Sequence, residues 1–166
     1  MKKSSTKNHT FYKEKKAKTV SRLYSVQALF QMEAGNIALD QVQLEFENFH
    51  DKENNKLNNF FKADMLLFRK IIEITIKDQN LIDQSIKLSL KKEWSIERID
   101  PTLRAIFRAA SAELILKTPP KVVINEFLEV TKAFFPNGKE CQLANGILDN
   151  LAKTIIKEDV FNRHSL

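Results

Sequence analysis

The segment CQLANGILDNLAK, Cys141 to Lys153, decides between two folds. Its Asn145-Gly146 pair between apolar residues is typical of a two-residue β-hairpin. The apolar positions around that pair instead repeat every three to four residues, as they do on one face of an α-helix. They are Leu143, Ile147, Leu148, Leu151 and Ile155. Because this spacing continues beyond the length of a short strand, the segment is predicted to be helical.

A glycine inside a helix needs a structural reason, because it costs about 1 kcal/mol relative to alanine. We expect Gly146 to let a second helix backbone come close, with Asn145 and Asp149 directed together toward a polar contact one turn apart. On this interpretation a methyl group added at Gly146 overpacks the contact and destabilises the fold.

The composition favours a helical protein with a single core. The chain has 166 residues, 43% hydrophobic and 29% charged, with only 3 Gly and 4 Pro to form sharp turns. No segment approaches the roughly 18 uninterrupted apolar residues of a membrane-spanning helix, and the basic start lacks the apolar run of a secretory signal peptide. We expect a cytoplasmic protein without a membrane partner, in which the one cysteine, Cys141, is a small core residue.

Apolar spacing predicts four helices in the N-terminal half. The first ends near Gly35, the second carries residues 39–49, and the fourth contains Ile82 and Ile86. The third carries the residues Phe60, Asp64, Leu67, Phe68, Ile71 and Ile72. Between the second and third lies HDKENNKLNN, residues 50–59, which is too polar for a core and is predicted to be a surface loop.

The C-terminal half has clear helix boundaries. Asp100 precedes Pro101, an arrangement that places a capping carboxylate before a proline in the first helical position. The segment 117–119 should end that helix and cap the next in the same way. Asn137, with Glu140 three residues later, resembles a capping box. Together these patterns predict an all-α fold, a compact bundle of about seven helices.

The positive charge is concentrated at the N-terminus. Residues 1–22 hold eight basic residues and one acidic residue, a net charge of +7, whereas the rest of the chain sums to −1. We predict a flexible basic arm at residues 1–18, one helical domain at 19–158 and a C-terminal tail at 159–166. A cationic arm either meets a polyanion or is a passive tail that aids solubility, and charge alone leaves both open.

The sequence contains no pattern typical of an enzyme. It lacks a glycine-rich phosphate loop, and its three histidines are not spaced as metal ligands on a helix. We therefore expect no catalytic residue, no metal and no cofactor.

Several segments resemble the NusB family of transcription antitermination factors. WSIERIDPTLRAIFRAASAEL (94–114), PPKVVINEFLEVTKAFFPNG (119–138) and ANGILDNLAK (144–153) are similar, in order and spacing, to three signature segments of that family. SRLYSVQALFQME (21–33) resembles its first helix. The resemblance implies a compact all-helical fold, in agreement with the periodicity.

The resemblance also implies a function. NusB proteins bind boxA RNA together with NusE, a small-subunit ribosomal protein, and nucleate a complex with NusA, NusG and RNA polymerase, notably on ribosomal RNA operons. It places RNA binding on the basic segment and the first helix, where lysine replaces most of the family's arginines. Tyr24 is the nearest aromatic residue available to stack on a base, although its spacing fits a position in the core equally well. The expected RNA-binding residues are Lys13, Lys15, Lys16, Lys18, Arg22 and Tyr24.

This chain departs from the family pattern at three places. Leu103 stands where the family often has an acidic residue, Ala112 replaces an aromatic residue, and residues 142–144 replace Lys-Phe-Val. The first change puts in doubt a charge that the family is expected to direct at its partner, and the last removes an aromatic residue near the expected RNA side. The resemblance gives Asp100 and Arg104 as candidate partner-binding residues.

Other matched residues are expected to serve the fold. Trp94 should cover the core, Arg104 and Arg108 should pair with Glu126 or Glu129, and the two asparagines should satisfy backbone groups at close helix contacts. The predicted structural residues are Trp94, Arg108, Asn125, Glu126, Asn145, Gly146 and Asp149.

Two alternative functions remain open at this point. One is a helical protein-interaction module with a passive tail. The other is a NusB-like domain related to rRNA cytosine methyltransferases, although such an enzyme needs a cofactor loop and catalytic cysteines that this one-cysteine sequence does not contain.

Overall fold

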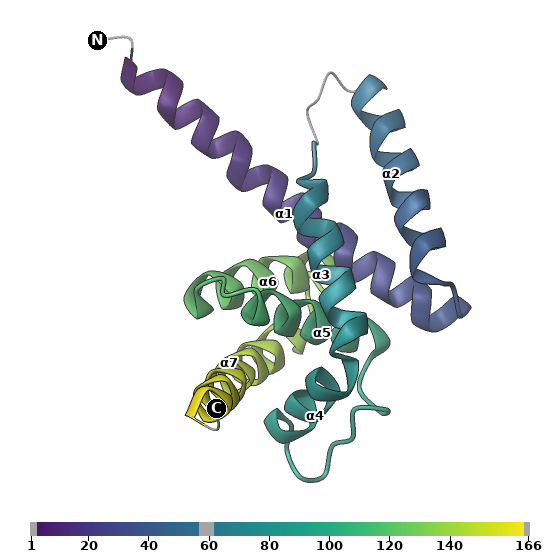
Figure 1. Ribbon diagram of the computed structural model, residues 1–166, viewed down its shortest axis with the longest axis vertical. Coiled ribbons are helices and arrows are strands. Elements are labelled where there is room, and N and C mark those ends of the chain that lie inside the picture. Colours follow the sequence, from purple (N-terminus) through teal and green to yellow (C-terminus); the bar gives the residue numbers. More distant parts are fainter. Residues whose placement is uncertain (1–2, 57–61, 165–166) are drawn as a thin grey trace. The chain divides into compact units, whose positions relative to one another are not determined.

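The computed structural model describes residues 3–56 and 62–164, with side chains described for 10–53 and 62–159. Within these ranges the chain forms seven helices and no strand (Figure 1), so the all-α prediction is confirmed. The helices are α1 (Lys3–Gly35), α2 (Leu39–Lys56), α3 (Met65–Lys77), α4 (Gln79–Ser89), α5 (Pro101–Ile115), α6 (Pro120–Phe134) and α7 (Glu140–His164). The segment 141–153 therefore lies inside α7 and forms no hairpin.

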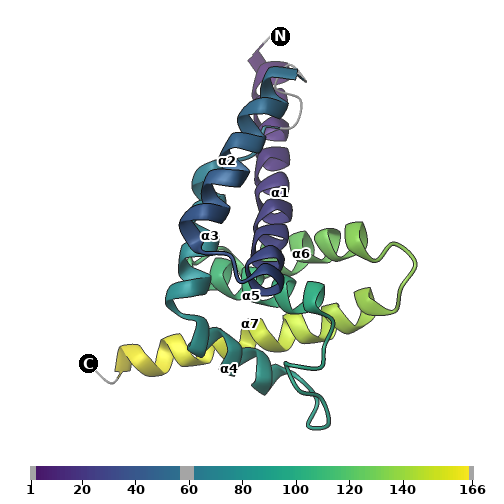
Figure 2. The same cartoon turned by 90° about the vertical axis from the view of Figure 1, so that its right-hand side faces the viewer.

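The chain separates into two compact units, residues 1–70 and 71–166, divided within α3. In the first unit α1 packs against α2, and Figure 2 shows the two helices side by side. They are joined through Asn36, whose φ of 49° lies in the left-handed region that asparagine tolerates. The helical arm is continuous with the first helix, because α1 begins at Lys3. The single domain and the flexible arm stay predictions.

The beginning of α3 is fixed to α1 by hydrogen bonds. The Asp64 backbone N–H donates to the Ala17 carbonyl (3.2 Å), and the Ser21 hydroxyl donates to the Asp64 carbonyl (2.6 Å). The Asp64 carboxylate accepts from the backbone N–H of Leu67 (3.0 Å) and so caps the helix. The sequence places Asp64 within this helix, but Asp64 precedes it as its cap. Phe60, also predicted to belong to it, lies outside the described residues.

The predicted surface loop at 50–59 is wrong for its first seven residues, which continue α2 to Lys56. His50 is buried, and its Nε2 accepts a hydrogen bond from the Ala63 backbone N–H (3.1 Å). A polar side chain is stable in the interior when it is bonded in this way. The remainder of that segment, from residue 57, lies outside the described residues.

In the second unit α5 is the central helix. It packs against α4, α6 and α7, and 11 of its 15 residues are buried, which is the pattern of a helix surrounded by others. It begins as predicted, with Pro101 in the first position and the Asp100 carboxylate accepting from the Thr102 backbone N–H (2.7 Å). Figure 2 shows α6 and α7 running alongside each other beyond their short connection.

Two other predicted caps are wrong. The segment 117–119 follows the end of α5, with Lys117 at φ 70°. The helix α6 begins at Pro120, with Pro119 as its N-cap residue and no side-chain cap. The capping box of Asn137 and Glu140 does not form, since α7 begins only at Glu140.

Gly146 does not lie at a close helix contact, which corrects the expectation from the sequence. It is exposed on α7, and a Cβ atom built there meets no heavy atom within 4 Å. Asn145 is exposed as well, and Asp149 binds Lys153 one turn further on (2.6 Å). The buried residues of α7 lie on its opposite face, so Gly146 relieves no crowding.

We therefore predict that Gly146→Ala raises the free energy of unfolding by about 1 kcal/mol, because alanine gains helix propensity and meets no neighbour. Urea denaturation measures the difference. Gly35→Ala is the matched control: its Cβ would lie 3.0 Å from Ile37 Cγ1, so the same mutation type should bring less gain. A Gly146→Ala variant that is less stable than the parent would contradict the open environment of this glycine.

Candidate nucleic-acid interface

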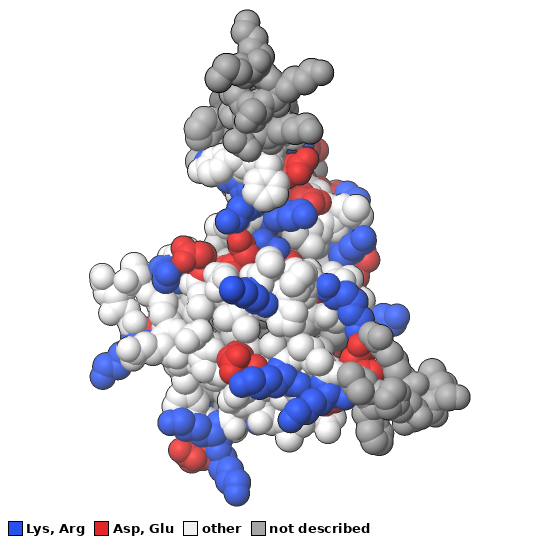
Figure 3. All heavy atoms as spheres, turned by 90° about the vertical axis from the view of Figure 1, so that its left-hand side faces the viewer, with Lys and Arg blue, Asp and Glu red and all other residues white. Residues whose placement is uncertain are grey.

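The lysines of the arm are carried by a regular helix. Lys13, Lys15 and Lys18 are exposed and Lys16 is half-exposed. Figure 3 shows one face of the molecule with the described Lys and Arg residues in blue. At about 100° per residue the four lysines spread around the helix. Lys15 and Lys18 are three residues apart and share one side of it. The structure places Lys13, Lys15 and Lys18 on the surface, facing different directions.

Arg22 and Tyr24 lie in the interior. This placement corrects the assignment of Arg22 to the RNA, and for Tyr24 it favours the core position that the sequence left open. Arg22 is 4% exposed and interacts with other groups of the protein. Tyr24 is 8% exposed. Neither side chain is presented to a ligand, because both lie on the part of α1 that is packed within the protein.

Tyr24 instead organises an aromatic core in the first unit. Its ring meets Phe46, Phe49 and Phe68 edge-on, at centroid distances of 5.6, 6.0 and 6.4 Å. Edge-to-face packing of this kind is favourable beyond the area it buries. Burial raises the pKa of the Tyr24 hydroxyl above its ordinary value, and the charge of Glu53 raises it further.

This pKa shift predicts a loss of stability at high pH. Above the ordinary tyrosine pKa of about 10 the unfolded chain releases the Tyr24 proton before the folded chain does. The free energy of unfolding therefore falls as the pH rises through the folded-state pKa and is unaffected by this group below about pH 9. We predict a smaller alkaline loss for Tyr24→Phe, measured by urea denaturation across a pH series. Tyr12→Phe, at an exposed position, is the control, and an identical pH profile for Tyr24→Phe and the parent would contradict the assignment.

Two exposed aromatic residues precede the lysines and were not identified from the sequence. Phe11 is 70% exposed and Tyr12 is 65% exposed, and both lie on α1. A signal was present in the sequence, because the helical period of the first helix can be extended backwards into the arm. A flexible arm has no helix face, so the prediction of one assigns these two residues to no surface.

The two candidate partner-binding residues have different surroundings. Asp100 is exposed, with one carboxylate oxygen engaged in the cap of α5. Arg104 is buried, and its Nη1 donates to the carbonyl of Ile96 (2.8 Å). Arg104 therefore holds the connection before α5 in place and does not present its charge to a partner. Leu103, where the family often has an acid, is buried as well.

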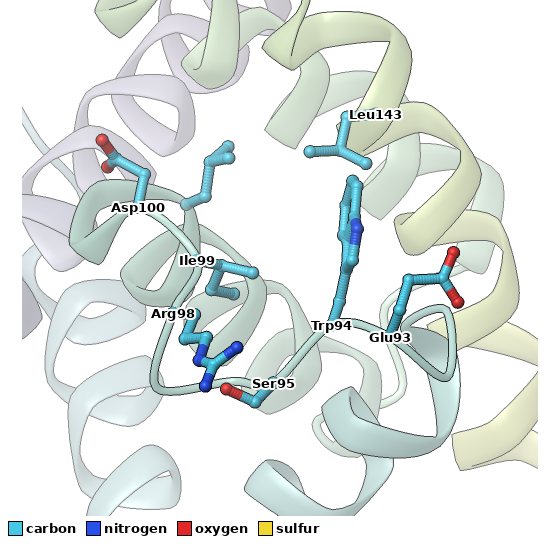
Figure 4. A pocket seen from close by; sticks show the side chains of 8 residues that line it. Glu93, Trp94, Ser95, Arg98, Ile99, Asp100 and Leu143 are labelled. Carbon is cyan, nitrogen blue, oxygen red and sulfur yellow. The ribbon is translucent and has the colours of Figure 1, made fainter.

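Trp94 does not cover the core completely. It is partly exposed on the connection between α4 and α5 and lines a pocket of about 270 Å³. Figure 4 shows Trp94 and Leu143 pointing toward each other in this pocket, with Arg98 and Asp100 at its edge. The Nζ atom of Lys91 lies 5.9 Å from the Trp94 ring centroid.

The remaining predicted structural residues are mostly on the surface of the second unit. Arg108 does have a structural role: it forms a two-pronged ion pair with Asp83 of α4, at 2.8 and 2.9 Å. Glu126 is half-exposed and bonded within the protein, while Glu129 binds Lys132 (2.8 Å). The predicted backbone-satisfying role of the two asparagines is wrong, because Asn125, like Asn145, is exposed.

The described part of the chain offers neither a metal site nor a membrane segment. Among its residues no three His, Cys, Asp or Glu side chains are grouped to hold a metal ion. None of its helices is long and apolar enough to cross a bilayer.

Seven helices and no strand in the described residues, with exposed lysines on the long first helix, place the protein in the class of all-α proteins. Comparison with known proteins gives the family. The NusB family model matches residues 19–153. The transcription antitermination protein NusB of Bartonella quintana (strain Toulouse) is 40% identical over 137 residues, which cover 81% of this chain and 87% of that protein.

Other relatives agree. The transcription antitermination protein NusB of Granulibacter bethesdensis is 37% identical over 149 residues, covering 86% of this chain and 91% of that protein. Among solved structures, T. maritima NusB has a TM-score of 0.64 and 28% identity, over 81% of this chain and 89% of that chain. The chain belongs to the NusB family. Its relatives carry the name of an antitermination protein and not of an enzyme.

Proposed function

We propose that this protein is a transcription antitermination factor that binds boxA RNA of ribosomal RNA operon transcripts together with NusE. In this function the RNA-bound pair nucleates a complex with NusA, NusG and RNA polymerase. Membership of the NusB family supports the proposal. The observation that carries the RNA-binding part is the set of exposed lysines, Lys13, Lys15 and Lys18, on the arm of α1.

Lysine chemistry suits the phosphate backbone of RNA. Each ammonium group neutralises a phosphate and releases a condensed counterion, which makes affinity fall with added salt. A lysine lacks the planar, two-pronged donor of arginine and so contributes charge more than base recognition. With Arg22 buried, the described lysines of the arm attract RNA mainly through their positive charge. Sequence preference must then come from contacts to the bases and from a partner protein.

We predict that changing Lys15 and Lys18 together to Ala reduces the slope of log affinity against log salt. Both lysines lie on one side of α1, so one strand can contact both. Each lost phosphate contact should reduce the slope by about 0.7, or about 1.4 for the pair. Fluorescence anisotropy with labelled boxA-like RNA across a salt series measures the slope.

A matched control keeps the charge change and moves it elsewhere. Lys70 and Lys77 are also exposed, and the double change Lys70→Ala, Lys77→Ala should leave the slope unchanged if RNA lies along the arm. Matched and scrambled RNA should weaken by similar factors in the arm variant, because phosphate contacts carry no sequence information directly. Equal slopes for the arm variant and the parent would place the RNA elsewhere.

The pairing with NusE predicts a thermodynamic coupling. This protein and NusE together should bind boxA-like RNA more tightly than this protein alone, and RNA should raise the affinity for NusE by the same factor. Isothermal titration of each pair and of the ternary mixture closes the cycle. Scrambled RNA should show less coupling. RNA affinity that is the same with and without NusE would rule out the partnership.

A further inference from the structure

Phe11 and Tyr12 are the feature of the described arm that phosphate neutralisation does not explain. Phe11 has the highest exposed fraction among the large apolar side chains described, 70%, and Tyr12 follows it at 65%. A single exposed apolar residue is common on protein surfaces. Two adjacent aromatic rings on one helix, both largely exposed, form an apolar surface that a binding partner could cover.

The helix places cations at a fixed distance from these rings. Lys15 lies one turn after Phe11 and Lys18 one turn further, so the three residues form a stripe along one side of α1. Lys16 lies one turn after Tyr12 on the neighbouring stripe. Adjacent turns are about 5.4 Å apart. A planar group resting on either ring therefore lies within reach of a lysine for an attached anion.

Stacking rings beside cations match the chemistry of a single-stranded nucleic acid. Each nucleotide combines a flat aromatic base with a phosphate, and proteins bind such strands by stacking bases on aromatic side chains in a positively charged setting. In a duplex the bases are already stacked and paired, so these rings have no free base to receive.

Other occupants match these residues less well. A helix lying in a membrane surface needs a continuous apolar face, whereas here Phe11 is followed on its own side by Lys15 and Lys18. The segment 10–18 carries four lysines against the single acid Glu14. This charge favours a polyanion over an ordinary protein surface.

We propose that Phe11 and Tyr12 are base-stacking residues, which hold unpaired nucleobases of the RNA while Lys15 and Lys18 neutralise its phosphates. The inference rests on the proposed function and adds to it a source of affinity that depends on bases and not on charge. Because every base has an aromatic face, this contact requires an unpaired strand more strictly than it requires a particular sequence.

The test uses the full chain and single-stranded boxA-like RNA. The double change Phe11→Ala, Tyr12→Ala should weaken binding by about 5-fold to about 150-fold for each ring that stacks. The salt slope should stay as in the parent, since no phosphate contact is lost. The ring-preserving double change Phe11→Tyr, Tyr12→Phe should bind like the parent.

Two further controls make the readout specific. Leu88→Ala removes from α4 an apolar side chain that is 65% exposed, as Tyr12 is, and should leave RNA affinity unchanged. An RNA with abasic sites replacing the contacted nucleotides should bind the parent and the double-alanine variant equally well, because the stacked partner is already missing. Alanine favours helix, so circular dichroism should show intact helix content in the variant.

Each outcome separates this inference from the function on which it rests. If the double-alanine variant binds single-stranded RNA as the parent does, while the Lys15, Lys18 variant still changes the slope, the stacking role is wrong and the RNA-binding function stands. If the variant loses affinity for NusE and not for RNA, the rings contact protein and the inference is overturned. If the parent binds no boxA-like RNA with or without NusE, the proposed function fails and the stacking role fails with it.

Discussion

The aromatic packing of Tyr24 against Phe46, Phe49 and Phe68 fixes the rotation of α1 within the first unit. Because α1 is one helix from Lys3 to Gly35, this rotation also decides which residues of the arm face outward. The hydrogen bonds from the α3 start to Ala17 and Ser21 fix the same phase one to two turns earlier. Phe11, Lys15 and Lys18 face outward on one side of α1 because contacts through Ala17, Ser21 and Tyr24 fix the helix from another side.

Much of the fold follows from local rules that the sequence states directly. Apolar spacing and the Asp100-Pro101 boundary identify α5, and the continuation of the spacing past Asn145-Gly146 identifies α7. Local rules fail where a tertiary contact decides. His50 was assigned to a loop because of its polar neighbours, yet the Ala63 backbone supplies the bond that allows it to be buried.

The candidate site was only partly predictable for a related reason. Charge density identifies the lysines without any knowledge of the fold. Arg22 and Tyr24 have the right chemistry for RNA, but residue type does not reveal orientation, and three residues after Lys18, at Ser21, the helix enters the packed region. Gly146 shows the converse error, since a glycine that crowding does not require was assigned to a crowded contact.

The length of α1 couples the arm mechanically to the core. The helix is held from Ala17 to Tyr24 by the α3 hydrogen bonds and the aromatic packing, and about 9 Å of helix at 1.5 Å per residue extends from Ala17 to Phe11. A tilt of about 10° of this held segment therefore moves Phe11 by about 1.6 Å. Repacking of Phe46 or Phe68 would therefore alter where the arm meets a ligand, even though neither side chain lies near the arm's surface.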